Sequence, residues 1–372
     1  MKRRVIVSVI NDLFTDRRVD RTCKTLCNMG FEVVLIGRRY NDSPVLHERN
    51  YITFRMHLAF RTGPFFYAEY NLRLFFFLLF RKANMLVSND LDTLLPNFLI
   101  HKIKRIPLIY DTHEYFTGVP ELVKRKKVRN FWKNIEKRIF PKLKHVITVN
   151  DNIAGLYKKE YGNEIFVVRN IPERIENFKK LTKAELGLPE DKKIILFQGA
   201  GINIERGAEE AVEAMQYIDN AVLIILGEGD VIDLLKVKVE DMGLNQKVKF
   251  IPRQAPERLP AYTELADLGL TMDKDTNINY RYSLPNKLFE YIHAGVPVLA
   301  SKLPEIKKII EKYEIGGFID NHEPEHIALK MKEMLDNVHL REKWKLNLQK
   351  AASELNWENE QNILKEIFSA YA

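Results

Sequence analysis

Cysteine is nearly absent from this chain of 372 residues, which carries two, Cys23 and Cys27. They lie four residues apart in a segment with a helical pattern, a geometry too wide for a comfortable disulfide. No further cysteine is present to complete a zinc site. A disulfide-stapled or zinc-held fold is therefore excluded, and we expect two small thiols in a reducing cytosol.

Long apolar runs are missing as well. The run from Val5 to Ile10 has six residues and is interrupted by Ser8, which predicts a first strand rather than a signal peptide. In the aromatic segment 54–80, charged residues leave seven consecutive apolar residues, Leu74 to Phe80, which are too few to span a bilayer. We expect this segment to form a buried helix and the protein to be cytoplasmic.

Glycine and proline are scarce too, at 17 and 15 residues, while hydrophobic residues make up 46% of the chain. This composition excludes collagen-like, low-complexity and disordered chains. At about 150 residues per domain, the length predicts two to three domains, each with its own core.

Acidic residues are scarce in the first half only. Residues 1–178 hold 32 Lys and Arg against 18 Asp and Glu, whereas residues 179–372 hold 26 against 32. The stretch from Lys124 to Lys144 alone has ten cations and one anion, Glu136. No helix-turn-helix, zinc-finger or RNA-binding signature accompanies it, so we expect no nucleic acid partner. A single basic block suits an anionic membrane surface or an anionic acceptor.

The basic block from Lys124 to Lys144 also has apolar residues at helical spacing, which predicts an amphipathic helix. Two interpretations stay open. The helix lies on anionic lipid at the inner face of the membrane, or its apolar stripe faces the core and its charges face solvent. The apolar positions are Val128, Phe131, Trp132, Ile135 and Ile139.

What the chain does contain is an alternation of short β-branched runs with longer helical segments, which predicts an α/β protein with parallel sheets covered by helices. The pattern of each half predicts a Rossmann-like domain. We expect the boundary between the two domains near residue 178, after Pro172. The expected strands are 4–10, 32–37, 51–56, 84–88, 107–111, 145–149 and 165–169 in the first half, and 193–198, 221–226, 247–251, 268–272, 296–300 and 317–319 in the second.

Ligands of open α/β sheets bind beyond the carboxyl ends of the strands, so the loops there carry the candidate sites. The loop from Gln198 to Gly207 opens a helix and includes Arg206, which together would make a phosphate cradle; an ordinary strand-to-helix turn is the alternative. A second tight turn holds Gly227 and Gly229. The loop with Arg253 could present backbone groups to a nucleobase.

The most informative segment runs from Tyr282 to Ser301. Glu290 lies inside an apolar helix, where a carboxylate is costly unless it meets a donor such as a sugar hydroxyl. Pro285 at the helix start leaves the N–H groups of Asn286 and Lys287 free for a diphosphate. A helix, a stop at Gly295 and a buried strand then follow.

The run from Ser283 to Ser301 resembles the signature helix of the retaining GT-B glycosyltransferases of family 4, the large group 1 class. The resemblance covers nearly the whole chain. Its other motifs are Gly199 to Gly207, Gly227 to Gly229 and Val167 to Pro172, with Thr15 to Val19, Asn89 to Asp92, Tyr110 to Glu114 and the Trp357 helix.

The resemblance implies a GT-B fold in which two Rossmann-like domains face a central cleft. Residues 1–178 would bind the acceptor, residues 179–354 would bind the nucleotide sugar, and the helix 355–372 would pack back on the first domain. The implied activity transfers a sugar from a nucleotide diphosphate to an acceptor hydroxyl with retention, in polysaccharide, lipopolysaccharide or glycolipid assembly. UDP, GDP and dTDP stay open as donor nucleotides, and no cofactor is implied.

By position in the motifs, the resemblance assigns Glu290 to the ribose hydroxyls and Arg206 to the departing diphosphate. His113 matches the histidine that faces the donor sugar, and Asp16 lies in the loop nearest the acceptor. The remaining donor-site residues would be Gly199, Gly201, Gly227, Arg253, Ser283, Leu284, Pro285, Asn286 and Lys287.

Two positions depart from the family pattern. Tyr282 stands where the motif has its first Glu, which opens the question of the donor sugar, and Ala200 stands where an Arg is usual. Arg206, with Lys287, would then be the main phosphate cation. Replacement sugar contacts from Asp273, Asp275 and Arg281 are one interpretation, and a solvated loop is the other.

Structural roles stay open for several of these residues. His113 could cap a helix, and Asp16 could be the N-cap of the helix that follows it. The Asp90-Leu91-Asp92 sequence is not expected to hold a metal in this fold, and we expect no obligatory metal. Retention without a nucleophilic carboxylate implies front-face substitution. The competing functions are a GT-B sugar-nucleotide epimerase or phosphorylase, and a non-catalytic nucleotide-binding protein.

Overall fold

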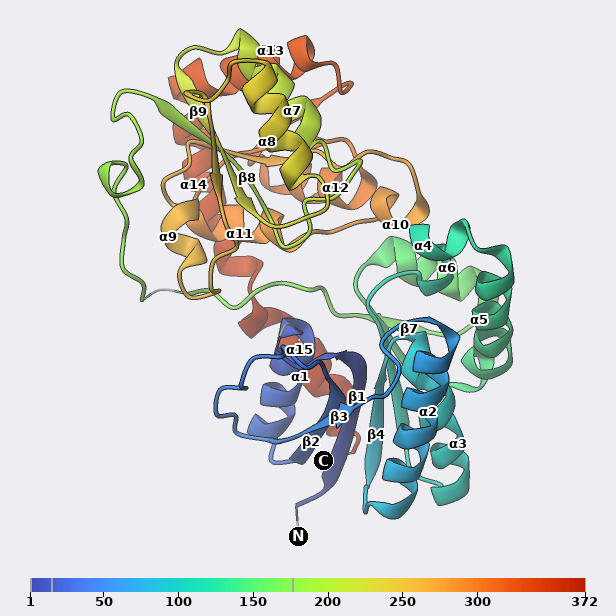
Figure 1. Cartoon of the computed structure of the whole chain (residues 1–372). Helices are drawn as coiled ribbons and strands as arrows, with labels where there is room; N and C mark the ends of the chain where they lie inside the picture. The colour runs from blue at the N-terminus through green and yellow to red at the C-terminus, as the bar shows by residue number, and fades with distance from the viewer. Residues whose placement is uncertain (1, 15, 176, 372) are drawn as a thin grey trace. The chain divides into compact units, whose positions relative to one another are not determined.

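The computed structural model describes residues 2–14, 16–175 and 177–371 and divides into two compact units (Figure 1). The first unit comprises Met1–Asn170 with Glu360–Ala372, and the second comprises Ile171–Asn359. Each is described here by itself. Thr15, one residue of the motif after the first strand, lies outside the described residues.

The first unit is built on a sheet of seven parallel strands in the order β3-β2-β1-β4-β5-β6-β7. Every predicted strand of this half is present, within two residues at either end. The strands are β1 (Arg4–Asp12), β2 (Glu32–Arg39), β3 (Ile52–His57), β4 (Met85–Asn89), β5 (Leu108–Thr112), β6 (His145–Thr148) and β7 (Ile165–Val167).

Helices cover this sheet because its central strands are apolar on both faces. α2 (Gly63–Phe80) packs on α3 (Leu91–Lys104), and α3 packs on α5 (Lys126–Ile139), so these three form one layer (Figure 1). The other helices of the unit are α1 (Arg17–Asn28), α4 (Pro120–Val123), α6 (Asp151–Tyr161) and α15 (Trp357–Ser369).

The last helix, α15, belongs to the first unit from Glu360 onward. Glu360 is buried, and its carboxylate accepts a hydrogen bond of 2.6 Å from the Arg169 backbone N–H and one of 2.8 Å from the Arg169 guanidinium. Leu364 and Phe368 of the same helix are buried as well. The chain therefore leaves the first unit near Asn170 and returns to it at its end.

The second unit has a sheet of six parallel strands in the order β10-β9-β8-β11-β12-β13. Ile171 is buried in its core, so this unit begins seven or eight residues before the change of charge at 178. The strands are β8 (Lys193–Gly199), β9 (Ala221–Gly227), β10 (Val248–Ile251), β11 (Leu268–Thr271), β12 (Val298–Ser301) and β13 (Gly316–Ile319). The helices are α7 (Ala208–Ala214), α8 (Ile232–Asp241), α9 (Leu259–Thr263), α10 (Ile278–Arg281), α11 (Asn286–Ala294), α12 (Pro304–Tyr313), α13 (Pro324–Asp336) and α14 (Val338–Glu354).

Each sheet has one point where the strand order reverses, between β1 and β4 in the first unit and between β8 and β11 in the second. Parallel sheets bind ligands beyond the carboxyl ends of the strands at such a point. The motifs after these strands therefore lie where a parallel sheet binds its ligand.

Two expectations about the first unit need correction. The aromatic helix α2 is buried on one side only, because Phe65, Phe76 and Phe80 are exposed. The basic helix is shorter than the stretch 124–144: Lys124 and Arg125 precede α5, and of its apolar residues Trp132 and Ile139 are buried whereas Phe131 is exposed. Within the described residues, no helix combines the length and apolar character that crossing a bilayer requires.

Candidate functional site

In the second unit the loop between β8 and α7 is held in place by Gly207. Its φ is +81°, and a Cβ there would lie 2.5 Å from the backbone oxygen of Met272, so a side chain has no room. The loop is also joined to the segment after β11 by a 2.9 Å hydrogen bond from the Lys274 N–H to the Glu205 oxygen. The loops of the two switch-point strands are thereby packed together.

Arg206 and Lys287 share one carboxylate, that of Asp273. The Arg206 Nη1 lies 3.3 Å from Asp273 Oδ2, and the Lys287 Nζ lies 4.0 Å from Asp273 Oδ1. Asp273 is fully buried, and its Oδ1 accepts no hydrogen bond from the described residues. The Arg206 guanidinium also lies 4.8 Å from the ring centre of Tyr280. Two cations are thus held at the carboxyl end of β11, with one anion between them.

Lys287 is a buried cation. Its Nζ lies 4.4 Å from the ring centre of Phe197, and burial lowers the pKa of its ammonium despite the nearby Asp273. Burial of a cation that its neighbours do not fully compensate favours an anionic ligand.

Glu290 is oriented by a chain of hydrogen bonds. Gln198, at the end of β8, donates from Nε2 to Glu290 Oε2 at 2.6 Å, and its Oε1 accepts from Thr263 Oγ1 at 2.9 Å. Gln198 and Thr263 are both buried. The predicted polar residue in an apolar helix therefore has a fixed direction. It is supplied by Gln198, the first residue of the predicted phosphate loop, and by Thr263, which carried no motif in the sequence.

Helix α11 is anchored to the sheet by Tyr291. Its hydroxyl donates to the oxygens of Leu196 and Leu270 at 2.9 and 3.2 Å, and a Cβ at Gly269 would lie 2.6 Å from its ring. At the other end of the helix, Pro285 is the N-cap and no side chain caps the first turn. The Ser283 Oγ nearby is buried without a hydrogen-bond partner among the described residues.

The predicted glycines divide into two groups. A Cβ at Gly227 would lie 1.8 Å from the Gly199 oxygen, and one at Gly229 would lie 2.0 Å from the Ile202 oxygen, so these two let neighbouring loops touch. A Cβ at Gly199 or Gly201 would meet nothing closer than 3.5 Å. The turn at Gly227 is thus required by packing, whereas the space at Gly199 and Gly201 is open.

Three residues named from the sequence are not part of this cluster. Arg253 is exposed after the edge strand β10, and none of the described contacts joins it to Arg206 or Glu290. Asp275 and Arg281 form an exposed ion pair with each other, at 2.9 Å. The interpretation of a solvated loop therefore fits these two, whereas Asp273 belongs with Arg206.

In the first unit His113 follows β5 and is held by Asp90, which follows β4. The His113 Nδ1 lies 3.2 Å from Asp90 Oδ2, and its backbone N–H donates to Asp90 Oδ1 at 2.8 Å. The His113 Nε2 is buried without a hydrogen-bond partner among the described residues. The alternative that His113 caps a helix does not hold, because the next helical turn, Phe116–Gly118, has Tyr115 as its N-cap.

Asp90 has a strained backbone. Its φ of 59° and ψ of 167° fall in a region that residues other than glycine rarely adopt, at a cost of about 1–3 kcal/mol. A 2.9 Å hydrogen bond from its N–H to the Asp111 oxygen helps to hold it. Backbone strain of this kind is concentrated at functional sites. Nothing in the sequence predicted a strained conformation at Asp90.

Asp16 has the structural role that the sequence allowed. It is the N-cap of α1, with Oδ1 accepting from the Val19 N–H at 3.1 Å, and Asn11 Nδ2 donates to Oδ2 at 3.2 Å. Beneath it, Arg18 forms a buried bidentate pair with Asp111, at 2.8 and 3.2 Å. This ion pair connects the start of α1 to the end of β5, directly before His113.

Burial raises the pKa of several carboxyl groups around His113. The pKa of Glu114 is raised to about 8, and those of Asp90 and Asp92 are raised as well, in each case chiefly by burial. Among the described residues no group of three or more His, Cys, Asp or Glu is arranged to hold a metal ion. Of these three carboxyls, Asp90 contacts His113.

Comparison with known proteins shows the class to which this arrangement belongs. The family model of glycosyl transferases group 1 matches residues 178–351, and that of glycosyltransferase family 4 matches residues 15–171. The chain therefore belongs, domain by domain, to these glycosyltransferase families.

Particular relatives and structures agree in fold. An uncharacterized glycosyltransferase of Methanocaldococcus jannaschii is 28% identical over 229 residues, which are 60% of this chain and 55% of that relative, so the match spans about half of its length. Sucrose-phosphate synthase of Thermosynechococcus elongatus superposes with a TM-score of 0.79 at 16% identity, over 99% of this chain and 100% of that one. HepE of Anabaena, in complex with UDP and glucose, gives a TM-score of 0.74 at 14% identity, over 99% and 100%. The fold is GT-B, as the sequence predicted.

Proposed function

We propose that this chain is a retaining glycosyltransferase that moves a sugar from a nucleotide diphosphate to an acceptor hydroxyl in the assembly of a polysaccharide, lipopolysaccharide or glycolipid. The observation that carries the proposal is the pair of cations at the switch point of the second unit. Arg206 and Lys287 lie on either side of the buried Asp273, next to the uncapped start of α11.

The donor would be held as follows. Its diphosphate would take the place of Asp273 as the partner of Arg206 and Lys287, and the N–H groups at the start of α11 would add hydrogen bonds. Glu290, oriented by Gln198, would accept hydrogen bonds from the ribose hydroxyls. A uridine nucleotide is the first to test, because the HepE structure holds UDP and glucose.

The reaction would be a front-face substitution. As the bond from the anomeric carbon to the diphosphate breaks, the negative charge grows on the leaving oxygen, and Arg206 and Lys287 stabilise it without a metal. The leaving phosphate would take the proton of the acceptor hydroxyl, while a new bond forms on the same face of the sugar. The protein contributes position and electrostatics. Isolation of a covalent sugar-enzyme adduct during turnover would refute this mechanism.

The first unit would supply His113 to the sugar and Asp16 to the acceptor region. His113 suits this role because Asp90 holds its Nδ1 side, while its Nε2, which lies 3.9 Å from Asp111 Oδ2, has no hydrogen-bond partner among the described residues. The acceptor itself would be a glycan or a lipid-linked glycan at the inner face of an anionic membrane, which the basic stretch 124–144 would approach.

Donor binding tests the proposal. A thermal-shift panel of UDP-, GDP- and dTDP-sugars on the full chain should raise the melting temperature with one nucleotide class, because a ligand at 100 times its Kd adds about 2.7 kcal/mol of stability. Arg206→Ala and Glu290→Gln should each abolish the shift. Glu290→Gln should keep the unliganded melting temperature, whereas Arg206→Ala should lower it, because the buried Asp273 loses its nearest cation. Lys236→Met, at an exposed cation of the same unit, is the matched control. Shifts that survive in both site variants would remove this assignment of the donor site.

A further inference from the structure

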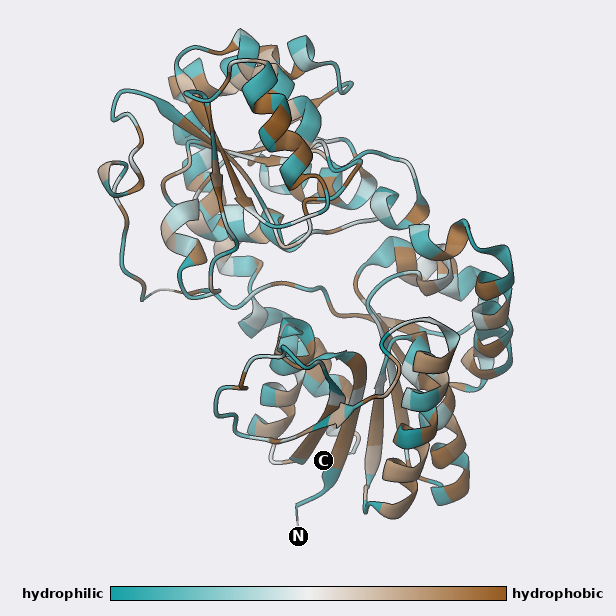
Figure 2. Ribbon diagram, in the orientation of Figure 1, coloured by the Kyte–Doolittle hydropathy of each residue, from teal (hydrophilic) through white to brown (hydrophobic). Residues whose placement is uncertain are grey.

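Helix α2 has two apolar stripes, whereas a helix on the surface of a protein needs one. The stripe of Phe66, Tyr70, Leu74 and Leu78 is buried against the unit. On the nearly opposite side, Phe65, Leu72, Phe76 and Phe80 are exposed, to 67%, 59%, 47% and 79%. Figure 2 shows the ribbon of α2 hydrophobic along much of its length.

The two other helices of this layer also expose apolar side chains. In α3, Leu99 and Ile103 are exposed one turn apart, and in α5, Val128 and Phe131 are exposed one turn apart. We name the exposed apolar residues of α2, α3 and α5 the helix-layer face. Exposed apolar residues are ordinary when they are scattered, but a continuous patch marks a binding surface.

The exposed charges of the segment that contains the helix-layer face are nearly all of one sign. Residues 61–142, all of which the structure describes, contain thirteen exposed Lys and Arg and one exposed carboxylate, Glu121. Glu69, on the outer side of α2, is neutralised by Arg73 at 2.7 Å and accepts N–H groups of Ala59 and Phe60. The segment 61–142 therefore combines exposed apolar side chains with a large excess of exposed cations.

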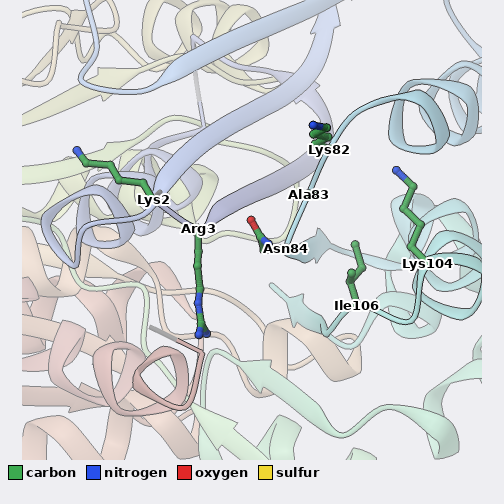
Figure 3. A pocket seen from close by; sticks show the side chains of 7 residues that line it. All are labelled: Lys2, Arg3, Lys82, Ala83, Asn84, Lys104 and Ile106. Atoms are coloured by element: carbon green, nitrogen blue, oxygen red, sulfur yellow. The ribbon is translucent and has the colours of Figure 1, made fainter.

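A cavity of about 510 Å³ at the amino end of the sheet adds to this positive charge (Figure 3). Four cations line it: Lys2, Arg3, Lys82 and Lys104. They do not converge on one point, because Arg3 donates to the Tyr371 oxygen at 2.6 Å and Lys104 donates to the Leu78 oxygen at 2.7 Å. The cavity thus supplies diffuse charge at the ends of α2 and α3 rather than a site for one anion.

We infer that the helix-layer face inserts into the interface of an anionic lipid bilayer. Exposed phenylalanine and leucine side chains enter the acyl boundary, while the surrounding Lys and Arg contact anionic headgroups, each cation being worth about 1 kcal/mol near such a surface. A second copy of the chain does not fit, because two such faces would bring like charges together. A soluble polyanion would match the cations but leave the phenylalanines in water.

This inference deepens the membrane part of the proposed function, and it does not depend on the donor site. It also assigns the main attachment to α2, which the sequence had predicted to be buried, and to α3, rather than to the basic stretch alone.

The test is co-sedimentation of the full chain with phosphatidylcholine vesicles and with vesicles that also contain phosphatidylglycerol. Wild-type protein should bind the anionic vesicles only. The variant Phe76→Ser/Phe80→Ser/Ile103→Ser should partition at least about tenfold more weakly, since about 25 cal/mol is lost per Å² of apolar surface. Leu234→Ser/Val237→Ser, which changes two exposed apolar residues of α8 in the second unit, is the matched control and should bind like wild type.

Salt and size measurements separate the alternatives. In about 0.5 M NaCl the wild type should retain part of its binding, because apolar insertion is not screened. Three results would each overturn the inference. The triple variant could sediment with anionic vesicles as fully as the wild type, or the wild type could lose all binding in salt. The wild type could also be a dimer that the triple substitution converts to a monomer. UDP binding in solution, measured on the same preparations, distinguishes this failure from a failure of the proposed function.

Discussion

Asp90 adopts a backbone conformation that glycine would occupy without strain, yet its carboxylate is the partner of His113. Two explanations of the strain are open: the carboxylate of Asp90 is needed for function, or the strain costs too little to matter. A glycine at this position separates the two, since it relieves the strain and removes the carboxylate together.

Asp90→Gly should leave the free energy of unfolding within about 1 kcal/mol of wild type, because relief of strain offsets the lost hydrogen bonds. Sugar transfer should fall at least about tenfold, because His113 loses its orientation. Urea unfolding and transfer rates measure both effects. The control is Glu314→Gly, at another residue with positive φ, which should transfer normally. Normal transfer by Asp90→Gly would show that the contact to His113 is structural only.

Glu114 should make stability depend on pH. Burial raises its pKa to about 8, so the folded chain keeps a proton that the unfolded chain loses above about pH 4.5. Its contribution to stability is complete below that pH and is lost as the pH rises through 8. Glu114→Gln should match wild type at pH 5 and be more stable on the order of 2 kcal/mol at pH 8.5.

Denaturant unfolding at the two pH values tests the role of Glu114. Glu164→Gln, at an exposed carboxylate, should change neither value. Parallel pH profiles of the wild type and Glu114→Gln would contradict the burial of this carboxyl.

Loss of the Lys287 side-chain charge should weaken donor binding without lowering the stability of the fold. Since burial lowers the pKa of its ammonium, Lys287→Met removes a desolvated charge while keeping the length of the side chain. The melting temperature should change little, because Arg206 still pairs with the buried Asp273, and UDP affinity measured by calorimetry should drop about tenfold or more. The exposed Lys236→Met is the control. Wild-type affinity in Lys287→Met would leave Arg206 as the sole phosphate cation.

At the scale of elements, the two groups of glycines give a matched comparison. Gly227→Ala forces a Cβ to within 1.8 Å of the Gly199 oxygen at a φ of +141°, and should cost about 3 kcal/mol or more. Gly201→Ala finds its nearest neighbour at 3.5 Å and should change stability by less than about 0.5 kcal/mol. Thermal melts of both variants decide it, and equal melting temperatures would refute the packing role of Gly227.

The strands could be predicted from the sequence because buried parallel strands are runs of β-branched residues, and all thirteen are present. The outward side of α2 could not, because an apolar helix is exposed or buried according to what its neighbours cover. For the same reason the exposed Phe131 and the buried Trp132 look equivalent in the sequence of α5.

The candidate site was predicted unevenly. Glu290 and Arg206 stand in motifs, and a carboxylate and a cation suit the binding of sugar hydroxyls and a diphosphate. Both could therefore be predicted as site residues from the sequence. The roles of Gln198, Thr263 and Asp90 could not be predicted, although Gln198 and Asp90 lie in quoted motifs, because each role depends on a side chain from another element. Motifs identify groups that touch a ligand more readily than the groups that orient them.

At the scale of the whole molecule, the charge of the chain is divided by unit. The excess of cations lies in the first unit, around the exposed residues of α2, α3 and α5, whereas the second unit carries the two cations of the candidate donor site at its switch point. The two units therefore have separate tasks in this account: the second binds a nucleotide sugar, and the first binds an acceptor at an anionic surface.

The most direct test of this account is transfer itself. Full-length protein would be incubated with UDP-, GDP- and dTDP-sugars labelled in the sugar, with anionic membranes as the source of acceptor, and both labelled product and free nucleoside diphosphate would be counted. We predict that one donor class gives equal amounts of both, that Arg206→Ala and Glu290→Gln give neither, and that Leu234→Ser transfers normally. Label transfer that is unchanged in both site variants, or no release of nucleoside diphosphate from any donor, would contradict it.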